Sequence, residues 1–329
     1  MTPPTLPRDF VWKRLHSLMG LWLVLFLMEH LFVNSQAALL LGENGQGFVR
    51  AVNAIHDLPY LPAIEVFLLG VPILIHAVWG IRLLFTSKPN SFRNQGNRPA
   101  LTEYKRNKAY TWQRLTSWIL LIGIIAHVVK FRFLDYPVSV NEGQTTSYIV
   151  KVHMDKGLYT LTERLGFKLY DKESVLREKE NLKSQQSDQA LLDTSTSSSE
   201  RVSFNADEES ALLSAQRYQE KEAYLKALEK ISLKDGEVIA VSPSFGTASL
   251  LSVRDTFKVP LYAGLYTIFV LAACFHGFNG FWTFLITWGA VIKIASQRRA
   301  AALSVALMLI VSFLGLAAIW GTYWLNLRS

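Results

Sequence analysis

The sequence predicts an all-α integral membrane protein, and three observations support this. Half of the 329 residues are hydrophobic and the mean hydropathy is +0.20, which is too apolar for an ordinary soluble protein. The apolar residues gather into blocks long enough to cross a hydrocarbon core of about 30 Å as helices. Basic residues gather in the connections between these blocks. We therefore expect five transmembrane helices that form one bundle.

The five spans follow from the apolar blocks. Their predicted ranges are 15–41, 61–85, 111–134, 259–292 and 300–325. No small-residue cleavage site follows the first block, so we expect an uncleaved span and not a signal peptide. In the second span, Pro72 cannot donate the helical hydrogen bond that the carbonyl of Leu68 would accept. We predict a kink there and a free Leu68 carbonyl.

The charge distribution predicts the orientation. Residues 138–255 carry a net charge of −4, so the remainder, at +12, holds the basic excess of a chain with a total of +8. Basic residues lie before the first span, between the second and third, and between the fourth and fifth, which indicates that these segments face the cytoplasm. We expect a multi-pass protein of the bacterial inner membrane with its N-terminus inside and its C-terminus outside. Membrane lipid explains the basic charge, and no nucleic acid partner is expected.

A polar insert separates the third span from the fourth. Residues 148–152 and 158–161 alternate in the manner of strands, and 209–231 have the pattern of an amphipathic helix. Residues 184–203 are rich in serine, as in a flexible tether. We predict an insert of mixed or disordered structure on the outer side.

The predicted domain organisation follows from these segments. It comprises spans one to three in 1–137, the insert in 138–255, and spans four and five in 256–329.

Four of the spans each contain a histidine at membrane depth: His30, His76, His127 and His276. Ionisable side chains at this depth are costly and are usually paired or functional. At 1.5 Å per residue, His30 and His127 both lie about 22 Å from the inner boundary, and His76 and His276 lie about 22 and 25 Å from the outer boundary. The histidines therefore form two depth-matched pairs, roughly 14 to 17 Å apart along the membrane normal.

Two facing imidazoles can ligate a metal from both sides, and imidazole suits iron, copper and zinc. Gly80, Gly123 and Gly280 each lie one turn from a histidine, which leaves room for a flat macrocycle, although close helix packing uses the same residue. The one cysteine, Cys274, excludes the Cys-x-x-Cys-His attachment of a c-type haem. We expect two non-covalently bound b haems; metal-free helix packing is the alternative.

The sequence around these histidines resembles the membrane-anchor cytochrome b of the succinate dehydrogenase and fumarate reductase family, in its single-polypeptide, five-helix, two-haem form. The matching stretches are 14–20, 29–31, 72–80, 112–116 with His127, and 275–289. The resemblance implies that His76 and His276 ligate the haem near the cytoplasmic flavoprotein and iron–sulfur subunits. It implies that His30 and His127 ligate the second haem. The insert is longer than the family leads us to expect.

The resemblance also implies contacts to the haem propionates. His16 and Ser17 match the family's polar positions at the start of the first span. We add Arg114, with Gln113 beside it, because a guanidinium pairs well with a carboxylate. Anchoring at the inner membrane boundary is the alternative role of Arg114 and Gln113.

The implied function is transfer of electrons from succinate oxidation through two haems to a quinone, expected to be menaquinone, near the outer face. The chain itself is not expected to act on succinate. Reduction of a quinone consumes protons, so we expect a polar pocket there, with Glu65 as the leading candidate and His56, Asp57 and Arg132 behind it. Two alternatives remain: a cytochrome b anchor of the formate dehydrogenase or hydrogenase type, and a transporter that uses buried histidines as a proton relay.

Overall fold

The computed structural model divides the chain into two compact units. One comprises Met1–Phe133 and Thr256–Asn326, and the other comprises Leu134–Asp255 and Leu327–Ser329. The residues that the structure describes are 6–39, 43–86, 91, 103, 105–142, 145–196 and 206–329. Most of the basic connection predicted between the second and third spans lies outside them.

Five helices of the described chain are long and apolar enough to cross a membrane, which confirms the prediction of a multi-pass helical membrane protein. The first is α1 (Arg8–Ser35), and the second joins α3 (Leu61–Glu65), the π-helical η2 (Val66–Gly70) and α4 (Val71–Thr86). The third joins α5 (Lys105–Val128) and the π-helical η3 (Val129–Leu134). The fourth is α10 (Pro260–Thr287), and the fifth joins α11 (Ile294–Leu316) and the π-helical η4 (Ala317–Asn326). Between the first two spans lie η1 (Glu43–Gly45) and α2 (Gln46–His56).

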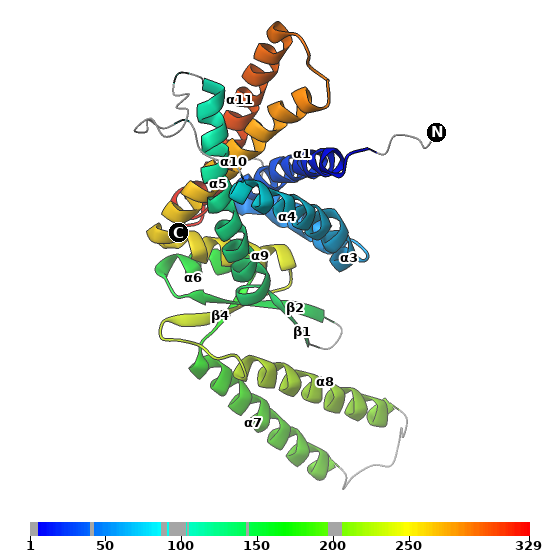
Figure 1. Cartoon of the computed structure of the whole chain (residues 1–329). Helices are drawn as coiled ribbons and strands as arrows, with labels where there is room; N and C mark the ends of the chain where they lie inside the picture. Colours follow the sequence, from blue (N-terminus) through cyan, green and yellow to red (C-terminus); the bar gives the residue numbers. More distant parts are fainter. Residues whose placement is uncertain are drawn as a thin grey trace, which may run out of the picture. The chain divides into compact units, whose positions relative to one another are not determined.

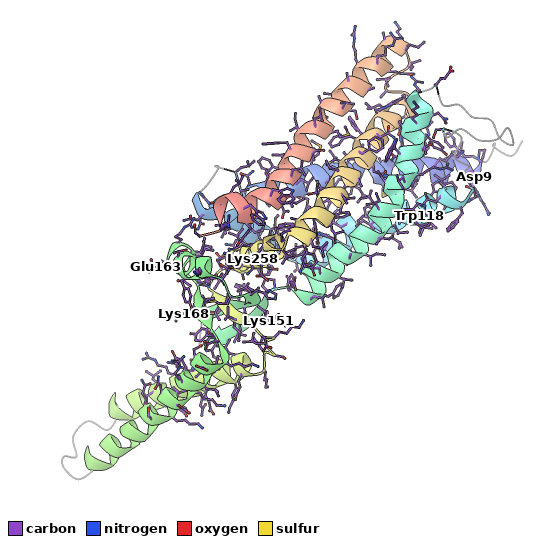
Figure 2. The ribbon with its side chains drawn as sticks, turned by 90° about the vertical axis from the view of Figure 1, so that its left-hand side faces the viewer. Asp9, Trp118, Lys151, Glu163, Lys168 and Lys258 are labelled. Atoms are coloured by element: carbon purple, nitrogen blue, oxygen red, sulfur yellow. The ribbon has the colours of Figure 1, made fainter. Side chains whose placement is uncertain are left out.

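Helix α10 packs against α1, α5 and α11, and α1 packs in turn against α4 (Figure 1). Glycines permit this close approach, because lipid supplies no hydrophobic force between helices and close packing must hold them together. A Cβ built at Gly315 of α11 would lie 2.5 Å from Cγ1 of Val270 on α10. Trp118, labelled on α5 in Figure 2, meets Phe85 of α4 edge to face at 6.0 Å.

The Leu68 carbonyl has a donor from another helix. The indole Nε1 of Trp22 on α1 donates a hydrogen bond of 2.6 Å to this oxygen. Leu68 lies in η2, directly before the turn that contains Pro72. The carbonyl that the proline leaves without its helical donor is therefore satisfied across the interface between two spans.

Two predicted span ends were wrong. The first span ends at Ser35 and not near residue 41. At this end, the side chains of Ser35 and Gln36 both donate to the carbonyl of Phe32. The fourth ends at Thr287 and not near 292, because Gly289 adopts a left-handed conformation with φ +72°. A glycine in this conformation ends a helix by turning the backbone away from its axis.

The second unit is built on a four-stranded antiparallel sheet of order β1-β2-β4-β3. The strands are β1 (Val138–Glu142), β2 (Thr145–His153), β3 (Lys168–Tyr170) and β4 (Glu237–Ser242), and the helices are α6 (Lys156–Leu165), α7 (Lys172–Thr196), α8 (Ala206–Glu229) and α9 (Phe245–Lys258). Helices α7 and α8 run side by side as a hairpin (Figures 1 and 2). The base of this hairpin packs on the sheet through Val175, Leu225 and Ile239.

The predictions for this insert had mixed outcomes. The strand at 148–152 and the helix at 209–231 are confirmed by β2 and α8. The prediction of a strand at 158–161 was wrong, because these residues belong to α6. The Asp155 carboxylate caps this helix by accepting a hydrogen bond from Gly157 N at 3.0 Å. The prediction of a flexible tether was wrong for residues 184–196, because α7 is helical as far as Thr196. Residues 197–203 lie outside the described residues.

Candidate metal centre

The histidines of α4 and α10 lie side by side. The ring centroids of His76 and His276 are 6.1 Å apart, and the ring planes are nearly perpendicular at 79°. Both side chains are half-buried within the protein. Residues 200 positions apart thus meet inside the membrane unit, and we call them the inner pair.

The histidines of α1 and α5 form a second pair of the same kind. The ring centroids of His30 and His127 are 5.8 Å apart, with the planes at 86°. We call these the outer pair. Both pairs are those predicted from the depth of each histidine along its span. In each pair, the two histidines come from different spans.

These separations suit one metal ion between two imidazoles. A metal–imidazole bond of about 2 Å, with about 1 Å more to the ring centre, puts two rings on opposite sides of one ion about 6 Å apart. In the described part of the chain, no cluster of three or more histidine, cysteine or carboxylate side chains could hold a metal ion. The pairs therefore fit a group that brings its own remaining ligands, as the tetrapyrrole of haem does.

Backbone carbonyls set the ring tautomers of the inner pair. Nδ1 of His76 lies 3.1 Å from the carbonyl oxygen of His16, and Nδ1 of His276 lies 3.2 Å from that of Gln113. A carbonyl oxygen only accepts, so both Nδ1 atoms carry the proton and donate. Each Nε2 is left with its lone pair, which is the arrangement of a metal-ligating histidine held by a second hydrogen bond.

A polar network around Gln113 ties α5 to α10 beside His276. Nε2 of Gln113 donates to the carbonyl of His276 at 3.0 Å, and Nδ2 of Asn279 donates to Oε1 of Gln113 at 2.8 Å. The hydroxyls of Thr116 and Ser117 lie 3.5 and 3.4 Å from Nδ1 of His276. This network fixes both the position of the helix and the orientation of the ring.

His16 contacts His76 directly. Their rings stack with centroids 4.0 Å apart and planes at 11°, and Nδ1 of His16 donates to the carbonyl of His76 at 3.1 Å. Gly20 makes this approach possible, since a Cβ there would lie 2.9 Å from Cε1 of His76. The sequence did not predict this contact with His76, and the propionate contact expected of His16 stays a prediction. Ser17 is the next residue of α1 and is half-buried.

Aromatic rings surround the outer pair. Phe26 lies 5.3 Å from His30, and Phe131, Tyr266 and Phe269 lie 5.3, 5.9 and 6.0 Å from His127 between centroids. The Tyr266 hydroxyl is 3.4 Å from Nδ1 of His127. The surroundings of the outer pair are therefore mainly aromatic, unlike the carbonyl-rich surroundings of the inner pair.

The glycines one turn from the histidines serve helix packing. A Cβ at Gly123 would collide with the ring of Phe269, and one at Gly80 would lie 3.7 Å from Cε1 of His16. A Cβ at Gly280 would meet Nε2 of Gln113 at 3.8 Å. Side chains of neighbouring helices thus lie beside these glycines, tightly at Gly123 and at ordinary contact distance at Gly80 and Gly280. The expectation that the glycines leave room for a macrocycle stays a prediction.

Arg114 carries buried donors. Its Nη1 and Nη2 atoms are inaccessible to solvent and have no hydrogen-bond acceptor within the described protein, while the guanidinium stacks on Tyr110 at 4.9 Å. Arg114 directly follows Gln113, whose carbonyl holds His276. A buried guanidinium without an acceptor suits a carboxylate from a bound group, and haem propionates are such carboxylates.

Two of the quinone candidates form an ion pair. Nη2 of Arg132, in η3, lies 2.7 Å from Oε2 of Glu65, at the end of α3. Each side chain is about one-third exposed, at 37% and 36%. His56 is the last residue of α2 and Asp57 follows it, in the connection between the first two spans. The pair is flanked by two π-helical turns, a feature frequent at functional sites.

Four residues near the histidines were not predicted from the sequence to have a role there: Thr116, Ser117, Asn279 and Tyr266. A usable signal was present, because Asn279 follows His276 by three residues and so shares its helix face. Thr116 and Ser117 follow the candidate Gln113 by one turn. Tyr266 left no such signal, since its contact with His127 joins residues 139 positions apart.

Comparison with known proteins found one curated relative. The chain is 36% identical over 126 residues to the succinate dehydrogenase cytochrome b558 subunit of Bacillus subtilis (strain 168). The matched region is 38% of this chain and 56% of that protein, so the chain spans just over half the length of the curated relative. No family model matches, and no solved structure matches. The similarity confirms the resemblance to the succinate dehydrogenase cytochrome b family.

Proposed function

We propose that this chain is the membrane-anchor cytochrome b of a succinate:quinone oxidoreductase in the bacterial cytoplasmic membrane. In this proposal it binds a flavoprotein subunit and an iron–sulfur subunit at the cytoplasmic face and passes electrons from succinate to a quinone near the outer face. The observation that carries the proposal is the presence of two histidine pairs, at 6.1 and 5.8 Å, on four different spans. Similarity to a cytochrome b558 subunit supports it.

The chain's own residues would bind and orient two haems. His76 and His276 would be the axial ligands near the cytoplasmic face, and His30 and His127 the ligands near the outer face. When bound, two b haems supply one-electron redox chemistry across the membrane. The Nδ1 bonds of the inner pair would hold each imidazole in one orientation and increase its basicity toward a metal. Arg114 would neutralise a propionate.

At the outer end, the Glu65–Arg132 pair is our candidate for the quinone site. A two-electron reduction of a quinone also takes up two protons, and a glutamate at the membrane boundary can deliver them. The arginine would hold the carboxylate in place, as its 2.7 Å contact indicates. Menaquinone is the expected substrate, and His56 and Asp57 remain candidates for the path by which protons arrive.

The deciding experiment is a reduced-minus-oxidised spectrum of the purified chain together with a haem assay. We expect a b-type band and two haems for each chain. Purified protein without any b-type absorbance would contradict the proposal, and absence of co-purified oxidoreductase subunits would then favour a transporter. Co-purification of formate dehydrogenase or hydrogenase subunits in place of a flavoprotein with succinate dehydrogenase activity would assign the chain to another oxidoreductase.

A further inference from the structure

The indole of Trp79 has a buried donor that no acceptor satisfies. Trp79 lies on α4, three residues after His76, and only 6% of it is exposed. Its Nε1 atom is inaccessible to solvent and has no hydrogen-bond acceptor in the described protein. Buried donors without acceptors are rare, because they lose their bond to water and gain nothing in return.

Two neighbours of Trp79 pack against the faces of its ring. Trp12 stacks on it with centroids 6.0 Å apart and planes at 8°, and the Arg82 guanidinium lies 4.6 Å above the ring. Neither group accepts a hydrogen bond. The Nε1 proton points outward in the plane of the ring, so an acceptor must approach from the edge.

A second unsatisfied group lies beside the inner pair. Arg114 on α5 has two buried nitrogens without an acceptor, and it follows the residue whose carbonyl holds His276. Trp79 is about 4.5 Å farther along the helix than His76, toward the cytoplasmic end in the proposed orientation. Helices α4 and α5 each therefore bring one unsatisfied donor residue within three positions of a residue that belongs to the inner pair or holds it.

We propose that Nε1 of Trp79 donates a hydrogen bond to a propionate of the haem ligated by His76 and His276. Arg114 pairs with this propionate or with the second propionate of the same haem. This inference rests on the proposed function. A carboxylate fits both donors, since it accepts from an indole N–H and pairs with a guanidinium. A water molecule fits less well, because it needs two to four polar partners and, of the two groups packed on the ring, only the Arg82 guanidinium is polar.

The bond has a measurable consequence for the reduction potential. A hydrogen-bond donor on a propionate partly neutralises the negative charge that this carboxylate places near the iron. When the donor is removed, the more negative carboxylate stabilises the ferric state, and the potential of that haem falls. The outer haem, held by other helices, keeps its potential.

The test is a redox titration of both haems in the purified complex, with Trp79→Phe, Trp79→Tyr and the control Trp12→Phe. Phenylalanine keeps the stack and removes the donor, tyrosine keeps a ring with a donor, and the control removes a stacked indole that is 43% exposed. We expect a lower potential for the inner haem in Trp79→Phe, partial recovery in Trp79→Tyr, and no change in Trp12→Phe.

Each other outcome is decisive. Unchanged potentials in Trp79→Phe overturn the inference. If Trp79→Phe loses the inner haem, retention of that haem in Trp79→Tyr supports the inference, and loss in both variants assigns Trp79 to packing. A shift that appears in phosphatidylglycerol nanodiscs but not in delipidated protein held in dodecyl maltoside, which has no phosphate, would make a lipid phosphate the acceptor and overturn it. Absence of haem from the unmodified complex would instead refute the proposed function.

Discussion

The two histidine pairs have nearly the same separation but different surroundings. The inner pair is held by backbone carbonyls of His16 and Gln113, whereas aromatic rings surround the outer pair. Hydrogen bonds fix the tautomer and direction of a ligand, while ring contacts fix mainly its position. Under the proposed function, this difference means that α1 and α5 orient the inner ligands through hydrogen bonds, whereas aromatic packing mainly shapes the outer site.

The strongest test of the pairing is loss of one ligand. We expect His76→Ala to lose the inner haem and keep the outer one, because a two-ligand site cannot hold its group with one ligand gone. The haem assay should fall from two to about one for each chain, with half of the b-type band remaining. His153→Ala, in the insert, serves as the control and should keep both haems. Retention of both haems in His76→Ala would refute the assignment.

The next largest effect should come from the outer end alone. We expect Glu65→Gln to slow quinone reduction by about 10²-fold or more, as removal of a proton donor does, while both haems stay bound. Asp9→Asn, which removes the 3.5 Å ion pair with Arg82 at the opposite end of the spans, should leave the rate unchanged. Steady-state quinone reductase assays over a range of pH measure this. Full activity with normal pH dependence in Glu65→Gln would remove it from the site.

Added methyl groups should perturb each pair separately. In Gly20→Ala the new Cβ would press on His76, and in Gly123→Ala it would press on Phe269 beside His127. Such overpacking costs about 1–3 kcal/mol. Each variant should therefore lower the thermal stability of one haem band and spare the other.

The control for this experiment is Gly264→Ala, because a Cβ at that glycine of α10 meets no atom within 4 Å. Its two haem bands should melt as in the unmodified protein. If Gly20→Ala and Gly123→Ala destabilise both bands equally, the two sites are not independent and the comparison fails.

The smallest effect concerns the bond from Trp22 to the Leu68 carbonyl. We expect Trp22→Phe to destabilise the membrane unit by about 1 kcal/mol, the usual net value of one hydrogen bond. Pro72→Ala restores a helical N–H to this carbonyl, so Trp22→Phe should cost less in that background. A double-mutant cycle of thermal stability measures the difference. Additive effects would show that the proline and the indole are not coupled.

Much of the membrane unit was predictable because its signals are local. Hydropathy locates a span, and a constant rise for each residue converts sequence distance into depth, so His76 could be matched with His276. Another local rule, that proline has no N–H to donate, predicted that the Leu68 carbonyl lacks its helical hydrogen bond. Helix ends were less predictable, because Gly289 ends its helix through a conformation that other glycines of the spans do not adopt.

The sequence by itself predicted which residues form the spans and which histidines pair, and the structure brings those pairs together. The tertiary structure decided what each pair touches. The carbonyl acceptors of His76 and His276, the stacked His16, the unsatisfied edge of Trp79 and the Glu65–Arg132 bond all depend on the rotation of one helix against another. Rotation is set by close packing at glycines such as Gly20 and Gly123, where the neighbour comes from a distant part of the chain.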